Sequence, residues 1–127
     1  EFEYGSCFSN CVGLIQSAKV VKVHNSAFRH NRALSEVGGF YFLEQTGADS
    51  IELKNSTFWN NTAPNVGAVN FNVRTALIEA CLFFDNHATE GSGGAVSSYC
   101  NDASCKHTMA FNNFTHNSAK LKGGAFY

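Results

Sequence analysis

The sequence has little charge and few of the residues that mark a typical soluble enzyme. Charged residues make up 15% of the 127 residues, and the formal net charge is −1. Proteins that bind nucleic acid or an anionic membrane normally carry a basic patch, so this composition argues against both partners. Proline, methionine and tryptophan occur once each, against twelve phenylalanines and eleven glycines. Such a composition is typical of a repetitive β architecture with many tight corners.

Long apolar runs are absent as well. No segment approaches the ~20 apolar residues of a membrane-spanning helix. The segment from Val12 to Ile15 is too short for the core of a signal peptide. The chain begins with Glu1 and not with Met, so we expect a mature or excised segment whose targeting signal or anchor lies outside it. No stretch has a sustained helical apolar period.

A repeat of four copies is the main feature of the sequence. Each copy has the form F-x-x-N-x-A, followed by a short variable loop, a Gly-Gly-Ala or related corner, and an apolar strand. The phenylalanines are 30, 25 and 31 residues apart, which suits one coil of a solenoid per repeat. The repeated pairs are Phe28 and Asn31, Phe58 and Asn61, Phe83 and Asn86, and Phe114 and Asn117.

The repeat predicts an all-β fold, in which residues 1–127 form one right-handed parallel β-helix of about four to five coils with 25–31 residues per coil. Leucine-rich repeats would need a leucine ladder, and propeller blades are longer. Stacked coils lie about 4.8 Å apart, so equivalent residues form columns. We expect an internal phenylalanine stack, an asparagine ladder at an inside corner, and a buried thiol at Cys81.

Two features predict passage through the secretory route. Sequons at Asn55, Asn60 and Asn113 fall on positions whose parity faces water, so we expect N-glycosylation there. Four of the five cysteines form close pairs, Cys7 with Cys11 and Cys100 with Cys105, in loops near residues 5–12 and 99–106. We expect local disulfides, with reduced thiols or a four-ligand metal site as alternatives. Neither spacing is the two-residue knuckle that zinc prefers, so we expect no metal and no cofactor.

The pairing of F-x-x-N with Gly-Gly-Ala and a hydrophobic strand, over residues 24–127, resembles the repeats of the chlamydial polymorphic outer membrane proteins. Similar repeats occur in large surface proteins of protists, which are grouped with the pectin-lyase-like β-helices. The resemblance implies a β-helical surface protein that serves in adhesion. The sequons and close cysteine pairs depart from the bacterial pattern and favour a eukaryotic extracellular or cell-surface protein.

Neither terminus has the polar cap that a solenoid needs against the exposed edges of its strands, so we expect both ends to be uncapped. When the tail is joined to the head, Phe126 and Tyr127 are followed by Phe2 and Tyr4, which would continue the strand after the last Gly-Gly corner. We therefore expect these four residues to be assembly ends. The expected partner is a second copy, head to tail, or flanking coils of the same chain.

Signs of catalysis are weak. The β-helix fold hosts polysaccharide lyases and hydrolases that use clustered carboxylates, but no pair of neighbouring aspartates occurs here. Asp85 and His116 would be neighbours on adjacent coils, although such a pair has no nucleophile or third ligand. Trp59 and Phe84 either tuck under a corner or form a stacking surface for sugars or for a neighbouring filament.

We therefore expect a non-catalytic extracellular structural glycoprotein whose repeat unit stacks into a fibre or a longer β-helix. The alternative is an adhesin or a carbohydrate-binding surface repeat, whose partners would be glycans. A β-helix polysaccharide lyase or hydrolase is the third hypothesis.

Overall fold

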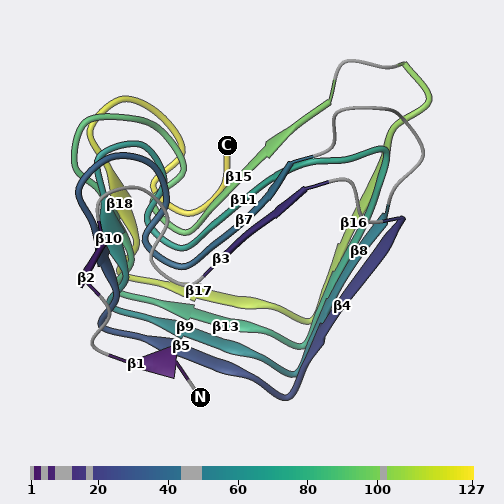
Figure 1. Ribbon diagram of the computed structural model, residues 1–127, viewed down its shortest axis with the longest axis horizontal. Coiled ribbons are helices and arrows are strands. Elements are labelled where there is room, and N and C mark those ends of the chain that lie inside the picture. Colours follow the sequence, from purple (N-terminus) through teal and green to yellow (C-terminus); the bar gives the residue numbers. More distant parts are fainter. Residues whose placement is uncertain (1, 4–5, 8–12, 17–18, 44–49, 101–102) are drawn as a thin grey trace.

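The computed structural model describes residues 2–3, 6–7, 13–16, 19–43, 50–100 and 103–127. Every element in these residues is a β-strand, and every strand pairs with its neighbours in parallel, so the described part of the chain is a parallel β-solenoid. The all-β solenoid class predicted from the repeat is confirmed. Each complete coil contributes one strand to each of four sheets, named sheets A to D below (Figure 1).

The strands of each sheet are stacked in the order of the coils. Sheet A contains β1 (Phe2–Glu3), β5 (Ala27–Arg29), β9 (Thr57–Trp59), β13 (Leu82–Phe84) and β17 (Asn113–Thr115). Sheet B contains β2 (Ser6–Cys7), β6 (Arg32–Ala33), β10 (Thr62–Ala63), β14 (His87–Ala88) and β18 (Ser118–Ala119). Sheet C contains β3 (Gly13–Gln16), β7 (Phe40–Leu43), β11 (Val69–Asn72) and β15 (Val96–Tyr99). Sheet D contains β4 (Val20–His24), β8 (Ser50–Lys54), β12 (Thr75–Glu79) and β16 (Lys106–Ala110).

The chain passes through sheets D, A, B and C in each coil. Three coils are complete in the described residues, namely β4–β7, β8–β11 and β12–β15. Partial coils flank them: β1–β3 on one side, and β16–β18 with a bridge between Val96 and Phe126 on the other. The solenoid thus has about three full coils where the sequence predicted four to five, because the residues at each end supply only part of a circuit.

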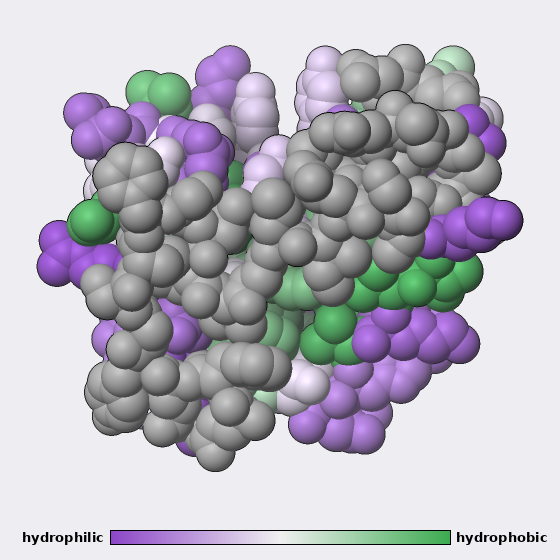
Figure 2. Space-filling view, in the orientation of Figure 1, coloured by the Kyte–Doolittle hydropathy of each residue, from purple (hydrophilic) through white to green (hydrophobic). Residues whose placement is uncertain are grey.

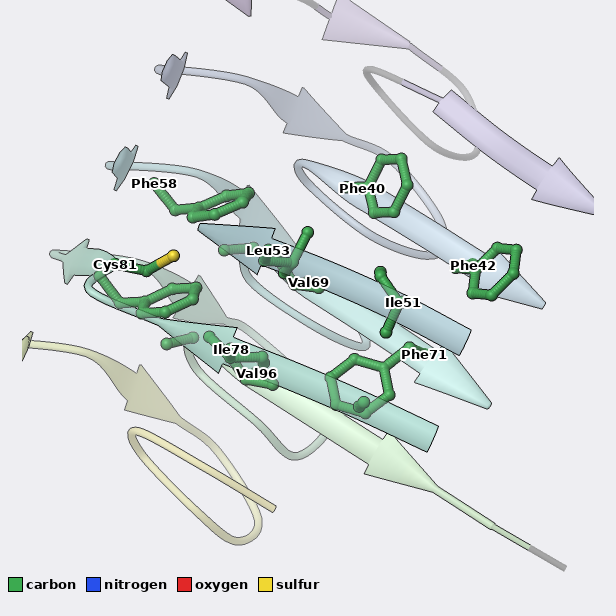
Figure 3. Close-up of a cluster of buried hydrophobic side chains, with 14 of the residues drawn as sticks. Phe40, Phe42, Ile51, Leu53, Phe58, Val69, Phe71, Ile78, Cys81 and Val96 are labelled. Carbon is green, nitrogen blue, oxygen red and sulfur yellow. The ribbon is translucent and has the colours of Figure 1, made fainter. Parts of the chain in front are cut away.

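The core lies inside the coil and follows the period of two along each strand. In β8 and β11, inward residues such as Ile51, Leu53, Val69 and Phe71 are fully buried, while the residues between them are half-buried. Figure 3 shows these side chains meeting between sheets C and D, with Phe58 approaching from sheet A and Cys81 from the corner before that sheet. Most of the coloured residues at the left and right edges of Figure 2 are hydrophilic, and a smaller group of hydrophobic residues is visible at the right.

Two corners of each coil are made by single residues with left-handed backbone. The corner from sheet D to sheet A uses Asn25, Asn55, Ala80 and Phe111 in successive coils. The corner from sheet A to sheet B uses His30, Asn60, Asp85 and His116. Asparagine and aspartate tolerate this conformation better than most residues, which explains part of the asparagine content of the chain.

The glycine corner before sheet C has a different cause. A Cβ on Gly38, Gly67 or Gly94 would overlap the carbonyl oxygen of Gly67, Gly94 or Gly124 in the next coil. Glycine is therefore required at this corner because successive backbones approach each other too closely for any side chain.

Candidate functional site

The phenylalanines of the repeat form one column inside sheet A. Phe28, Phe58, Phe83 and Phe114 occupy equivalent positions in successive strands. Their rings are stacked nearly parallel, with centroids 4.7, 4.9 and 4.8 Å apart. Phe58 and Phe83 are fully buried, whereas Phe114 in the last coil is only partly covered. The column thus continues as far as the described coils do.

The asparagines form a ladder with a direction. Asn61 Oδ1 accepts hydrogen bonds from the backbone N–H of Asn31 at 3.2 Å and from Asn31 Nδ2 at 3.0 Å. Asn86 Oδ1 does the same for Asn61, at 3.0 Å for each donor. Each amide also donates backwards, as Asn86 Nδ2 does to the Phe58 carbonyl at 2.9 Å. These buried amides are fully hydrogen-bonded, which is the condition for polar groups inside a core.

The ladder ends at Asn117. Its Oδ1 accepts from the backbone N–H and Nδ2 of Asn86, at 3.0 and 2.9 Å, and its own Nδ2 donates to the Phe83 carbonyl at 2.9 Å. Asn61 and Asn86 each donate their backbone N–H and one Nδ2 hydrogen to the asparagine of the following coil. Within the described residues, the equivalent two donors of Asn117 have no acceptor. The last coil therefore presents amide donors beside the partly covered ring of Phe114.

A second interior column contains Cys81. Ser26, Ser56, Cys81 and Asn112 lie two residues before the four phenylalanines, and Cys81 is a free, buried thiol. Its Sγ donates to the Glu79 carbonyl at 3.4 Å. Burial raises the pKa of the Cys81 thiol, although backbone hydrogen bonds at Ser56 and Glu79 oppose part of the rise. The position is that of an unreactive packing residue.

The three sequons lie on the outside of sheet A and its corners. Asn55 and Asn60 are left-handed corner residues; Asn55 is exposed and Asn60 is half-buried. Asn113 is exposed in β17, and the Thr115 hydroxyl donates to its Oδ1 at 2.7 Å. A glycan on any of these residues would extend from one side of the solenoid and would not enter the core.

Cys100 and Cys105 are joined by a disulfide in the loop between β15 and β16, with Cα atoms 6.4 Å apart. For the other expected pair, Cys11 and the side chain of Cys7 lie outside the described residues, as does the expected assembly residue Tyr4. A disulfide of this kind is compatible with an extracellular location. No helix in the described residues is long and apolar enough to cross a membrane.

The outer surface next to the corner between sheets A and B carries a row of rings. His30 and Trp59 have centroids 4.7 Å apart, Trp59 and Phe84 6.3 Å, and Phe84 and His116 5.4 Å. Trp59 is 38% exposed. Asn60 Nδ2 also lies 2.9 Å from His30 Nδ1. The rings are tilted against one another, so they form a ridge and not a flat platform.

Asp85 and His116, expected as neighbours from the repeat, have different main contacts. The His116 ring packs edge-on against Phe84. The Asp85 carboxylate instead contacts His87, with 3.1 Å between Oδ1 and Nε2. His87 Nδ1 in turn lies 2.7 Å from the Ser118 hydroxyl on the next coil. Asp85, His87 and Ser118 therefore form a continuous carboxylate–imidazole–hydroxyl relay on the outside of sheet B, which the sequence alone did not reveal.

The protonation of the relay follows from its geometry. A carboxylate only accepts hydrogen bonds, so in the neutral imidazole His87 Nε2 carries the proton and donates to Asp85. His87 Nδ1 is then an acceptor for the Ser118 hydroxyl proton. Ser118 is exposed, while Asp85 and His87 are half-buried. This is the arrangement in which a base lies against a hydroxyl nucleophile and a third group orients the base.

A second serine–histidine pair lies inside the coil. Ser98 Oγ is 2.6 Å from His107 Nδ1, and His107 Nε2 is 2.8 Å from the Val73 carbonyl. The His107 ring packs edge-on against Phe71, at 5.3 Å between centroids. This pair has a neutral carbonyl where the first has a carboxylate, and it occupies inward positions of sheets C and D.

A small hollow lies on the same outer face as the relay, although none of the three relay residues lines it. Its volume is about 220 Å³, and Thr62 on its wall pairs directly with His87 in the neighbouring coil. The side chains that line it include Arg32, Leu34, Thr62, Pro64, Thr89 and Glu90. No group of three or more metal-ligating side chains is placed to hold a metal ion within the described ranges.

The outside of sheet D carries an ion-pair network. Glu52 Oε1 lies 2.7 Å from His24 Nε2 and 3.4 Å from Lys54 Nζ, and Lys54 Nζ lies 3.3 Å from Glu79. Desolvation raises the pKa of Glu52, but the hydrogen bond from His24 and the charge of Lys54 outweigh it, so the pKa lies below its usual value. Such a network on an outer face contributes little stability.

The head of the chain corrects one expectation. The join of tail to head placed Phe2 in a strand that follows a Gly-Gly corner, which is the position of sheet C. This was wrong, because β1 lies in sheet A with Phe2 paired to Phe28, and Cys7 pairs with Ala33 in sheet B. The segment is a degenerate fifth copy, in which Gly5 and Cys7 stand where the other copies have Asn and Ala.

The last coil is where exposed hydrophobic side chains gather. Of the large hydrophobic residues exposed in the described part of the chain, Phe111, Leu121, Phe126 and Tyr127 belong to the last coil, and Tyr99 ends β15 in the coil before it. Phe111 is 88% exposed.

Comparison with protein-family models, with curated proteins and with solved structures finds no match for this chain. The class of the protein is therefore defined by the fold alone, as a parallel β-solenoid. The resemblance to the F-x-x-N repeats of surface proteins rests on the motif alone, because no family model matches the chain.

Proposed function

We propose that the chain is a structural segment of an extracellular β-solenoid glycoprotein, whose last coil is covered by a further coil of the same kind. That coil comes from another copy or from a flanking part of the same protein. The observation that carries the proposal is the end of the asparagine ladder. Asn117 presents amide donors to the position where, in every earlier step, the next asparagine accepts them.

The apolar surroundings of Asn117 support the same proposal. The ring of Phe114 is partly exposed at the position where Phe58 and Phe83 are sealed by a following ring. A further coil with F-x-x-N would cover the ring and accept both donors. Burial of about 100 Å² of apolar surface stabilises by roughly 2.5 kcal/mol, so this contact would be favourable as well as specific.

The sequence near the N-terminus helps to decide whether the covering coil is a flanking coil or the head of a second copy. Three residues after Phe2 stands Gly5, which has no side-chain acceptor for the donors of Asn117. A flanking coil with its own F-x-x-N motif therefore fits the last coil better than the head of a second copy does. Head-to-tail stacking of copies would continue the backbone pairing and leave the amide ladder interrupted.

Electron microscopy of native, undigested material tests the proposal. Fibres are expected if copies stack, with an axial repeat of roughly 24 Å, because each copy contributes five strands to sheet A at about 4.8 Å each. Long single solenoids are expected if flanking coils extend the chain. Isolated particles of three or four coils that do not associate at high concentration would contradict both versions.

A matched pair of variants locates the contact. Phe114→Asp places a charge on the apolar end of the column, whereas Lys120→Asp places the same carboxylate on the exposed outside of the same coil and leaves the sequon of Asn113 intact. Loss of association in the first variant only is expected. Equal behaviour of the two variants would show that the last coil is not the contact surface.

The extracellular location is part of the proposal. The Cys100–Cys105 disulfide and the outward placement of Asn55 and Asn113 support it. Removal of N-glycans by a glycosidase is expected to lower the mass of the native protein and to convert each occupied asparagine to aspartate. No change in mass would refute the glycoprotein assignment.

A carbohydrate-binding surface is the second candidate function. The ridge of His30, Trp59, Phe84 and His116 on the outside of the solenoid favours it, because exposed aromatic rings are common contacts for sugars. A glycan array probed with the native protein and with Trp59→Ala separates the candidates. Binding that depends on Trp59 would favour the adhesin hypothesis.

A further inference from the structure

We propose that Ser118 is an activated nucleophile, with His87 as its base and Asp85 as the positioning residue, and that this outer face hydrolyses carboxylic esters. This goes beyond the structural role proposed above and departs from the sequence-based expectation of a protein that is not an enzyme. That expectation rested on the absence of neighbouring aspartates and on the lack of a nucleophile beside the histidine and carboxylate. The structure supplies the nucleophile, because β18 brings Ser118 against His87 from the next coil.

The distances meet the requirements of general-base activation. A base must lie within hydrogen-bond reach of the proton that it removes, and the gap of 2.7 Å between His87 Nδ1 and Ser118 Oγ satisfies this. The carboxylate of Asp85, at 3.1 Å from Nε2, fixes the tautomer and stabilises the imidazolium that forms. Serine–histidine–aspartate sites are recognised by these roles and not by their order in the sequence.

The reaction balances without a cofactor. Ser118 Oγ attacks the carbonyl carbon of the ester, the Oγ–C bond forms, and the hydroxyl proton moves to His87 Nδ1. The tetrahedral intermediate collapses, the bond to the alcohol oxygen breaks, and the alcohol leaves with the proton from His87. Water then attacks the acyl-serine by the same route, which releases the carboxylic acid and restores the Ser118 hydroxyl.

The surroundings favour one side for the substrate. The hollow of about 220 Å³ lies along the same outer face, with Thr62 one coil from His87 and Thr89 two residues beyond it. Ser118 does not line the hollow and lies one coil beyond Thr89, so a substrate with a small group in the hollow would have to extend past His87 to reach it. Arg32 and Glu90 on the walls of the hollow make it polar, so short esters that carry hydroxyl groups, such as acetylated sugars, fit better than long-chain lipids.

The inner pair of Ser98 and His107 provides a control within the same chain. It has the same serine–histidine contact, at 2.6 Å, but its imidazole is oriented by a neutral carbonyl and packs against Phe71. If a close serine–histidine contact were enough for reactivity, both serines would react. The proposal requires that only Ser118 does.

The test uses a fluorophosphonate probe on the native, disulfide-intact protein, followed by peptide mass spectrometry. The probe forms a bond between phosphorus and the serine oxygen and releases fluoride. We expect modification of Ser118 and not of Ser98, no modification at this position in Ser118→Ala, and unchanged labelling in Ser98→Ala. Absence of a Ser118 adduct, or equal labelling of Ser98, would overturn the proposal.

Variants of the other two residues separate positioning from folding. His87→Gln is expected to slow labelling of Ser118 roughly 100-fold, within the usual range for loss of a general base. Asp85→Asn is expected to slow labelling and to change its pH profile, since the imidazolium loses its counter-charge. Hydrolysis of p-nitrophenyl acetate should fall in parallel, through kcat more than KM. Labelling that is independent of pH and of His87, in variants with unchanged circular dichroism, would refute the roles of His87 and Asp85.

Discussion

Replacement of Asn86 by alanine should be among the most damaging single changes in this protein. Asn86 is fully buried in the middle of the ladder, and its side chain makes four hydrogen bonds. Its Oδ1 accepts from the backbone N–H and Nδ2 of Asn61, and its Nδ2 donates to the Phe58 carbonyl and to Asn117 Oδ1. All four lie between 2.9 and 3.0 Å, so none is a marginal contact.

The magnitude follows from what alanine leaves behind. A hydrogen bond contributes about 1 kcal/mol net, and a buried group left without a partner costs about 1–3 kcal/mol. Two donors and two acceptors lose a partner here, although Asn61 Nδ2 keeps its bond to the Phe28 carbonyl. We expect a loss of about 4 kcal/mol in the free energy of unfolding. Domains of this size have about 5–15 kcal/mol in total, so the variant should be close to unfolding.

Urea unfolding followed by circular dichroism, with the disulfide intact, measures the effect. The control is Asn65→Ala, because Asn65 is exposed and makes one hydrogen bond, to Glu36 at 3.1 Å. Its expected loss is about 0.5 kcal/mol or less. If Asn86→Ala loses no more than Asn65→Ala, at an unchanged slope with urea, the ladder does not stabilise the fold and the support for a further coil at Asn117 is lost with it.

Three further outcomes are expected. Gly67→Ala should prevent normal folding, because its Cβ would overlap the carbonyl oxygen of Gly94, and a thermal melt would detect this. Burial raises the pKa of Cys81, so iodoacetamide should leave this thiol unmodified at neutral pH until urea unfolds the protein; rapid alkylation of the native state would contradict its placement. The pKa of Glu52 is lowered in the fold, so its ionised form stabilises above the unfolded pKa, and that contribution disappears as the pH falls through the folded pKa. Glu52→Gln should therefore flatten the acid side of the stability profile, and an identical profile would exclude a role for the pair with His24.

The interior of the solenoid could be predicted from the sequence because it repeats at fixed offsets. Phe28, Phe58 and Phe83 occupy one column, and the asparagine three residues later is inward in each coil. The period of two along a strand then fixes which neighbours face water. The degenerate copy at the head was missed because Gly5 and Cys7 follow Phe2 at the positions where the other four copies have asparagine and alanine.

The outer relay could have been found by aligning the repeats and extending the comparison from Asp85 and His116 to the residues two positions later. The register that places Asp85 beside His116 also places His87 beside Ser118. No single column contains the site, however, since Asp85 and His87 belong to one coil and Ser118 to the next. A search for chemistry within one column at a time therefore overlooks it. The distances also depend on a left-handed corner at Asp85, which turns its carboxylate back towards His87.

Asn86 and His87 show why a structural role and a reactive face can exist in one chain. They are adjacent in sequence, but the alternation of the strand sends Asn86 into the ladder and His87 to the outside. The inner residue is constrained by the coils before and after it, because each amide must match the next. The outer residue need not match its neighbours in this way. The position of His87 is occupied by Arg32, Thr62 and Ser118 in other coils. Variation on the outer columns thus costs the fold little, and a catalytic group can arise there without any change in the interior that holds the coils together.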